Sequence, residues 1–207
     1  MNKHATHPEL FDPLGKQYHL SPDKIDLFYQ YAQLLDEATC NVTTIRTLAD
    51  IVSYHFADSL ELGQALQLCN QTIIDVGSGG GFPGIPLKIA YPNCQLILIE
   101  VCAKKRAFLQ EVINKLNLSG ITIEEKDWRT FLRSTRYSVD VVCARASLAP
   151  HELLRMFQPS SPYKQASLVY WASSLWEPSE KERTLLHKIY PYQVGDRQRK
   201  LAFFHIV

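Results

Sequence analysis

The chain has 207 residues, of which 46% are hydrophobic and 21% are charged, and its formal net charge is +1. This composition excludes an intrinsically disordered chain, and the near-neutral charge excludes a uniformly basic nucleic-acid-binding surface. Five cysteines without a Cys-x-x-Cys pair argue against a disulfide framework or a zinc site, and the N-terminus lacks an apolar signal segment, so we expect a cytoplasmic protein with no membrane partner and no metal.

The N-terminal third has a helical pattern. Residues 1–20 are polar, with prolines at positions 8 and 13, and we expect them to form a loose arm. Residues 21–23 then combine a capping serine, a proline in the first turn and an acid, which predicts the start of a helix. A second helical pattern begins near Thr47. We therefore expect a helical extension over residues 21–65.

Over residues 66–207 the pattern changes to alternating strands and helices. Continuous apolar runs, typical of strands buried on both faces, occupy residues 72–76 and 95–100. Further strands are predicted at 121–125, 139–144, 167–172 and 201–207. Helices are predicted over 86–90, 103–117, 150–158 and 179–188. This alternation predicts an α/β domain with a mostly parallel sheet that carries helices on both faces.

A glycine-rich loop follows the first predicted strand, and ligands of open parallel sheets bind beyond the carboxyl ends of the strands. The loop lacks the Gly-Lys-Ser/Thr ending of a phosphate-binding P-loop. Counted from Gly77, a dinucleotide fingerprint requires a third glycine where the chain has Phe82. Asp75, just before the first glycine, would also repel a pyrophosphate. These features disfavour nucleotides that carry phosphate.

Asp75, Gly77, Gly79 and Gly81 form the pattern D-x-G-x-G-x-G, which fits a different ligand. Glu100 ends the next strand, where a carboxylate can accept hydrogen bonds from both ribose hydroxyls of an adenosine. Asp75 can face an ammonium group or orient water on it. An adenosine joined to an amino acid without phosphate describes S-adenosylmethionine. The alternative to a cofactor site is that the glycines only form a tight turn between strand and helix, and that Glu100 is a solvent-exposed strand end.

Several short motifs resemble the RsmG (GidB-type) family, bacterial enzymes that methylate N7 of a guanine in 16S ribosomal RNA. Residues 81–92, GFPGIPLKIAYP, are similar to the GLPGIPLAI-type stretch of that family. Residues 41–43 and 55–59 resemble its N-L-T and H-x-x-D-S motifs. Residues 104–109 and 144–146 resemble its K-R-x-x-F-L helix start and its S-R-A motif. The resemblance runs in order through roughly residues 20–205.

The resemblance implies a class I methyltransferase fold, which is Rossmann-like with a mostly parallel seven-stranded sheet, plus an N-terminal helical extension. It implies S-adenosylmethionine as cofactor and the 16S rRNA of the small ribosomal subunit, in the 530-loop region, as substrate; we expect a monomer. Carried over by position, the cofactor contacts fall on Gly77, Phe82, Glu100, Trp128, Arg129 and Arg145.

Three residues, Arg145 among them, are candidates for positioning the substrate. Arg145, at the carboxyl end of a buried strand, is expected to hold the cofactor carboxylate, the guanine O6 or a phosphate, with a structural ion pair as the alternative. His55 and Asp58 lie three positions apart on a helix and are expected at the mouth of the pocket, with a stabilising His–Asp pair as the alternative. Guanine N7 carries a lone pair and no proton, so the transfer needs positioning rather than a strong base. Positioning can lower the barrier by about 7–11 kcal/mol.

The chain also departs from the family pattern. Arg129 stands where an acid is frequent, Tyr54 where an arginine is usual, and Trp171-Ala172 where lysine and glycine are common. The changes at Tyr54 and Trp171 remove positive charge that we expect near RNA. Two alternatives therefore remain: a methyltransferase for a small molecule or a protein, and an RNA- or protein-binding module with a vestigial cofactor pocket.

Overall fold

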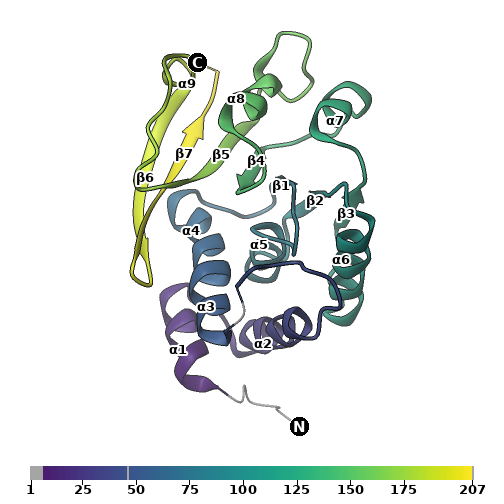
Figure 1. Cartoon of the computed structure of the whole chain (residues 1–207), viewed down its shortest axis with the longest axis vertical. Coiled ribbons are helices and arrows are strands. Elements are labelled where there is room, and N and C mark those ends of the chain that lie inside the picture. The colour runs from purple at the N-terminus through teal and green to yellow at the C-terminus, as the bar shows by residue number, and fades with distance from the viewer. Residues whose placement is uncertain (1–6, 46, 207) are drawn as a thin grey trace.

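A seven-stranded sheet forms the centre of the molecule (Figure 1). The computed structural model describes residues 7–45 and 47–206. The strands lie in the order β3-β2-β1-β4-β5-β7-β6, and all pairs are parallel except those that involve β7. Their bounds are β1 Thr72–Val76, β2 Gln95–Ile99, β3 Ile121–Glu124, β4 Val141–Arg145, β5 Ser167–Ser173, β6 Leu186–Val194 and β7 Arg197–Phe204. The predicted mostly parallel α/β sheet is confirmed.

The strand order reverses between β1 and β4, which are neighbours in the sheet although two strands separate them in the sequence. The chain runs outward from β1 through β2 to β3 and then returns to start the other half at β4. The loops that leave β1 and β4 therefore diverge to opposite faces. In open parallel sheets the crevice at such a point is where ligands bind.

Helices cover both faces of the sheet, and each face has its own hydrophobic cluster. On one face lie α1 (Pro8–Gln17), α2 (Pro22–Asp36), α3 (Leu48–Ile51), η1 (Val52–Ala57), α4 (Asp58–Ala65), α5 (Gly84–Ala90) and α6 (Ala103–Lys115). On the other lie α7 (Trp128–Ser134), α8 (Pro150–Leu153) and η2 (Leu154–Phe157), and the short helix α9 (Glu180–Arg183) precedes β6. The helices before residue 66 thus share one core with the sheet, and the domain boundary at residue 66 stays a prediction.

The expected loose arm over residues 1–20 is wrong for its greater part, because Pro8–Gln17 form the helix α1. Pro8 occupies the first helical position, where a proline removes no hydrogen bond. The buried side chains of Phe11 and Leu14 attach α1 to the core. The hydroxyl of Tyr18, just after the helix, donates to the Glu61 carboxylate at 2.7 Å. Residues 1–6 of the expected arm lie outside the described residues.

The helix expected over 179–188 is also wrong at its C-terminal end. Only Glu180–Arg183 are helical, and Leu186–Val194 form β6, a strand that was not predicted. Pro191 cannot continue a helix, and the β-branched and aromatic residues around it favour a strand. A tight turn at Gly195, whose φ is 57°, then pairs Val194 with Arg197 in the last hairpin.

The helical segment from Leu48 to Ala65 is continuous, but its middle part, η1, is a π-helix. Segments of π-helix are rare in proteins, and those that occur are frequently found at functional sites. The segment carries Tyr54 and His55 in η1 and Asp58 at the start of α4. Among the described residues, no helix has the length and apolar character needed to cross a membrane.

Candidate active site

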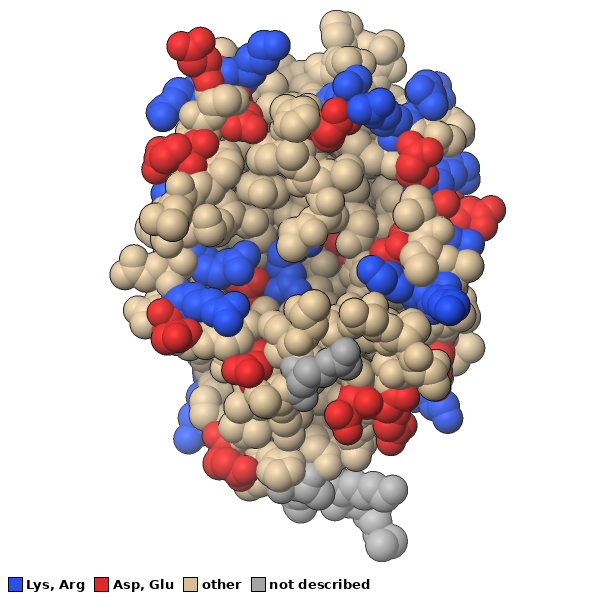
Figure 2. Space-filling view, in the orientation of Figure 1, with Lys and Arg blue, Asp and Glu red and all other residues tan. Residues whose placement is uncertain are grey.

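A cavity of about 650 Å³ opens at the carboxyl ends of β1, β2 and β4, beside the point where the strand order reverses. The loops after four neighbouring strands supply its walls, together with the first turns of α6, α7 and α8. On the face drawn in Figure 2, lysine and arginine side chains gather on both sides of the middle. The lining residues are Val76, Gly77, Ile99, Glu100, Val101, Lys105, Asp127, Trp128, Arg129, Ala146, Ser147, Leu148 and Glu152.

Gly77 sets the distance between the loops that leave β1 and β4. Its φ is 71°, and a Cβ atom at this position would lie 2.5 Å from the Cβ atom of Ser147. Gly81 lies elsewhere in the loop and has a φ of 100°, and an added Cβ would meet Ile85 and the hydroxyl of Tyr31. The first glycine therefore bounds the cavity, whereas the last one allows the loop to pack on α5 and α2.

The Glu100 carboxylate lies at the floor of the cavity, with only 6% of the residue exposed. One oxygen accepts the amide N–H of Gly79 at 2.9 Å, and the other accepts the amide N–H of Cys102 at 2.8 Å. A carboxylate has about four acceptor positions, so each oxygen keeps capacity for another donor. Two neighbouring ribose hydroxyls supply donors of the type that this carboxylate can still accept.

Asp75 lies beneath the glycine loop and has no exposed surface. Its Oδ2 accepts the amide N–H of Gly84 at 2.9 Å, whereas its Oδ1 has no hydrogen-bond partner within the described part of the chain. Burial raises the pKa of this carboxyl to about 7. A buried acceptor without a partner is unusual in a native protein and fits a ligand ammonium group or a water molecule.

The opposite wall of the cavity contains Trp128 and Arg129, as expected, and two acids that sequence reasoning missed. Asp127 caps α7, with one oxygen accepting the amide N–H of Thr130 at 3.0 Å. Glu152 enters from α8 and makes an ion pair with Arg129 at 2.9 Å. An aspartate directly before a helical pattern is a capping signal that could have located Asp127. No local signal links Glu152 to residues that lie 23 positions earlier.

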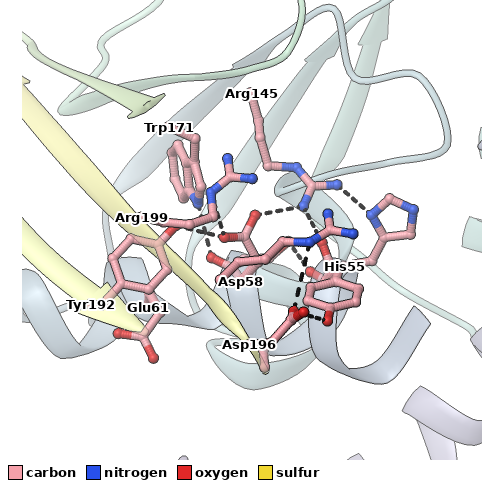
Figure 3. A network of polar contacts seen from close by, with 12 residues as sticks. His55, Asp58, Glu61, Arg145, Trp171, Tyr192, Asp196 and Arg199 are labelled. Carbon is pink, nitrogen blue, oxygen red and sulfur yellow. Dashed lines mark hydrogen bonds and ion pairs between the residues drawn. The ribbon is translucent and has the colours of Figure 1, made fainter. Parts of the chain in front are cut away.

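Arg145 organises a second group of polar residues next to the cavity (Figure 3). One terminal nitrogen donates to the Asp58 carboxylate at 2.8 Å and to the carbonyl oxygen of Tyr54 at 2.9 Å. The other terminal nitrogen lies 2.6 Å from Nδ1 of His55. The structure therefore joins His55 and Asp58 through Arg145, although 87 positions separate Asp58 from Arg145 along the chain.

Asp58 is fully buried and carries more than one positive partner. Besides Arg145, its carboxylate accepts the hydroxyl of Tyr192 at 2.6 Å and has Nε of Arg199 at 3.4 Å. Two guanidinium groups thus face one carboxylate. The structural ion pair considered as an alternative for Arg145 is therefore present, with Asp58 as the partner. Arg145 thus has a structural role whatever ligand it binds.

The contacts of His55 determine where its proton lies. Because a guanidinium can only donate, Nδ1 must accept the bond from Arg145, and the proton resides on Nε2, which lies 2.5 Å from the Thr43 hydroxyl. Burial, followed by the charge of Arg145, lowers the pKa of His55 to about 3. The ring stacks on Phe82 with 4.0 Å between centroids. His55 is thus neutral, and both of its ring nitrogens are engaged.

The predicted cofactor residues fall into two groups in the structure. Gly77, Glu100, Trp128 and Arg129 line the cavity. The others surround it without lining it: Asp75 and Gly81 lie below the glycine loop, Gly79 anchors that loop on Glu100, and Phe82 and Arg145 belong to the polar group of His55 and Asp58. Cofactor contact by either group remains a proposal.

Comparison with known proteins assigns the family. The family model described as "rRNA small subunit methyltransferase G" (GidB) matches residues 24–194. The chain belongs to this family. Curated relatives with the name Ribosomal RNA small subunit methyltransferase G include one from Limosilactobacillus reuteri, 31% identical over 82% of this chain and 74% of the relative. Another, from Mycoplasma capricolum, is 40% identical over 60% of this chain and 53% of the relative. The chain thus aligns with about half to three quarters of the length of these relatives.

Solved structures agree on the fold of this methyltransferase G family member. A SAM dependent methyltransferase from Aquifex aeolicus superposes with a TM-score of 0.52 at 16% identity, covering 84% of this chain and 97% of that one. A mutant of MtNAS in complex with S-adenosylmethionine superposes with a TM-score of 0.60 at 17% identity, covering 99% and 80%. The expected class I methyltransferase fold is confirmed, and this family uses S-adenosylmethionine as cofactor.

The structure explains the two positions, Trp171 and Tyr54, where the chain lacks a positive charge common in the methyltransferase G family. Trp171 is buried in β5, and its indole N–H donates to the carbonyl oxygen of Asp58 at 2.9 Å, so it lies beneath the surface rather than on it. Tyr54 donates its hydroxyl to Asp196, and the Arg197 guanidinium lies 3.8 Å above its ring. A cation therefore stands directly over Tyr54, from the turn between β6 and β7.

Proposed function

We propose that this protein transfers a methyl group from S-adenosylmethionine to N7 of a guanine in the 16S rRNA of the small ribosomal subunit. One observation carries the proposal beyond family membership. At the strand-order reversal, Gly77 and the Glu100 carboxylate bound a cavity of about 650 Å³, with the unpartnered Oδ1 of Asp75 beneath the same loop. This arrangement of acceptors suits an adenosine and an ammonium group.

Seven residues at the site have a proposed role in holding the cofactor, whose sulfonium methyl is the group transferred. Glu100 accepts hydrogen bonds from the ribose hydroxyls, and the bare backbone at Gly77 allows close approach. Asp75 faces the ammonium group directly or through water. Trp128 forms an apolar wall for the adenine. Gly79, Gly81 and Phe82 keep the loop in the shape that this contact requires.

The chemistry proposed for the acceptor needs no base. Guanine N7 attacks with a lone pair and loses no proton, which is consistent with the neutral state of His55 and the full engagement of its ring nitrogens. Arg145, held by Asp58 and His55, is proposed to position the guanine or its phosphate beside the cavity. The three residues then act as a rigid positioning unit rather than as a proton-transfer system.

The direct test uses S-adenosylmethionine with a labelled methyl group and small ribosomal subunits from cells that lack this activity. The RNA is digested after incubation and analysed by mass spectrometry for labelled 7-methylguanosine. A single labelled guanine in 16S rRNA is the expected result, and Glu100→Ala should abolish it. Cofactor binding without any labelled RNA would refute the acceptor and point to another one. Absence of cofactor binding would refute the enzymatic proposal as a whole.

The proposed substrate also suggests a cellular location and an oligomeric state for the protein. We propose that it acts as a monomer in the cytoplasm, where ribosomal subunits are assembled. Sedimentation at micromolar concentration tests the monomer, and a second copy bound at that concentration would contradict it.

A further inference from the structure

Arg129 and Glu152 join two walls of the cavity that come from different parts of the sheet. Arg129 lies in the first turn of α7, which follows β3, and Glu152 lies in α8, which follows β4. Both residues line the cavity. β3 and β4 are not neighbours, because β2 and β1 lie between them in the sheet. The contact between the two side chains therefore spans the width of the site.

The contact is a two-pronged ion pair. The Arg129 Nε atom donates to one Glu152 oxygen at 3.1 Å, and one terminal nitrogen lies 2.9 and 3.0 Å from the two oxygens. Such a fork is more specific in geometry than a single bond and is stronger than one between neutral groups. Hydrogen bonds from Arg155 and Arg129 also lower the pKa of Glu152, so the carboxylate is charged at neutral pH.

A second hydrogen bond connects α7 to α8. The indole N–H of Trp128, the residue before Arg129, donates to the carbonyl oxygen of Glu152 at 3.2 Å. Trp128 is almost fully buried, whereas 57% of the Arg129 side chain is exposed. The indole contact is thus shielded from solvent, whereas the ion pair lies at the edge of the cavity in contact with solvent.

We propose that Arg129 and Glu152 form an ionic latch across the rim of the cofactor cavity, and that the latch must open for cofactor to enter and for demethylated product to leave. An exposed ion pair contributes little to stability and opens easily, and salt weakens it further. The latch therefore slows exchange without blocking it. This inference rests on the proposed cofactor site and gives Arg129 a role at the rim in place of the direct cofactor contact expected from the family resemblance.

A latch differs from a binding contact in its kinetics. A residue that only gates the rim changes the association and dissociation rates by the same factor and leaves the dissociation constant unchanged. A residue that holds the cofactor changes mainly the dissociation rate, and the affinity falls. The two roles can thus be separated by measuring both rates on one variant.

Arg155 offers a matched control. Its Nε atom lies 2.9 Å from the same Glu152 oxygen, but both residues come from one continuous helical segment and Arg155 does not line the cavity. Arg155→Ala removes a positive partner of Glu152 without removing the connection between the two walls. Arg129→Lys keeps the charge at the rim but loses the fork.

The experiment measures association and dissociation of S-adenosylmethionine and S-adenosylhomocysteine by stopped-flow fluorescence, for the full chain and its variants. We expect Arg129→Ala to raise both rates about fivefold and to leave the dissociation constant within about twofold. Arg129→Lys should fall in between, Arg155→Ala should match the wild type, and Arg129→Ala should have no further effect in a Glu152→Gln background. Raising the salt from about 0.05 M to about 0.5 M should speed exchange in the wild type more than in Arg129→Ala.

Two results would overturn the latch. Unchanged rates in Arg129→Ala would reduce the ion pair to a structural contact between α7 and α8. A faster dissociation with weaker affinity and unchanged association would make Arg129 a direct cofactor ligand instead. If the wild type binds neither compound, the proposed function fails and the latch with it, whereas wild-type binding with unaltered variant rates refutes the latch alone.

Discussion

The Glu100 carboxylate at the end of β2 accepts a hydrogen bond of 2.9 Å from the amide N–H of Gly79, in the loop after β1. The residue proposed to hold the ribose therefore also holds the loop on which the rest of the cofactor is proposed to lie. One acid supports two parts of the site, so its removal should harm binding in two ways.

We expect Glu100→Ala to weaken binding of S-adenosylmethionine about thirtyfold or more, because hydrogen bonds to charged groups contribute about 1.5–3 kcal/mol each. Titration calorimetry measures the change. Glu125→Ala, at a side chain that is 75% exposed, is the control and should bind normally. An unchanged affinity in Glu100→Ala would contradict the ribose assignment.

The glycine loop allows a comparison of two similar substitutions. Gly77 and Gly79 both have positive φ, 71° and 58°, but only Gly77 faces a close neighbour, the side chain of Ser147. Both alanine variants should lose about 1–2 kcal/mol to the left-handed backbone. Gly77→Ala should lose more stability than Gly79→Ala, as measured by denaturant unfolding. It should also bind cofactor less well, because the cavity wall must shift. Equal effects in the two variants would show that the approach of Ser147 does not matter.

Removal of the Arg145 guanidinium should destabilise the fold. The Asp58 side chain is 1% exposed and the Arg145 side chain 10% exposed, so Arg145→Met leaves a buried carboxylate with Arg199 as its remaining cation. Breaking a buried pair in this way costs about 3–5 kcal/mol. Adding Asp58→Asn should recover part of the loss, as judged by urea unfolding. Arg183→Met, in an exposed pair with Glu177 at 3.9 Å, should change stability very little.

Asp75 and His55 give the stability opposite dependences on pH. The Asp75 pKa is raised from 3.8 to about 7, so the folded state binds the proton more tightly and this residue's contribution falls as pH rises between those values. The His55 pKa is lowered from 6.5 to about 3, so its contribution falls as pH drops through that window. In the wild type the two effects partly cancel between about pH 4 and about pH 6.5.

Single variants should reveal each contribution. Asp75→Asn should lose stability on acidification from neutral pH more steeply than the wild type, because only the His55 effect remains. His55→Gln should gain stability relative to the wild type over the same pH range, because only the Asp75 effect remains. Urea unfolding at several pH values measures both slopes. Parallel slopes in all three proteins would mean that neither group has a shifted pKa.

Much of the fold is encoded locally. The apolar runs at 72–76 and 95–100 became β1 and β2 almost to the residue, because a strand buried on both faces requires continuous hydrophobic side chains. The glycine spacing and Glu100 located the cavity, since both are read from short segments whose position after a strand is known. Family membership followed from the same motifs.

Other features depended on contacts between segments that are distant in sequence. The prolines suggested a loose arm, but α1 is stabilised by burial of Phe11 and Leu14, which periodicity in a short polar stretch did not reveal. The strand β6 needs the pairing with β7, and its mixed pattern of exposed residues resembled the end of a helix. In both cases tertiary packing decided what local propensity left open.

The sequence by itself determined the parallel strands β1 to β5, the glycine loop and the acid that faces it, because each depends on the order of residues within one segment. Only the tertiary structure decided that Arg145 meets His55 and Asp58, that Arg129 meets Glu152, and that Trp171 is buried. These contacts join residues 23 to 113 positions apart. Which of them meet depends on the order of the strands in the sheet, and no local pattern records that order.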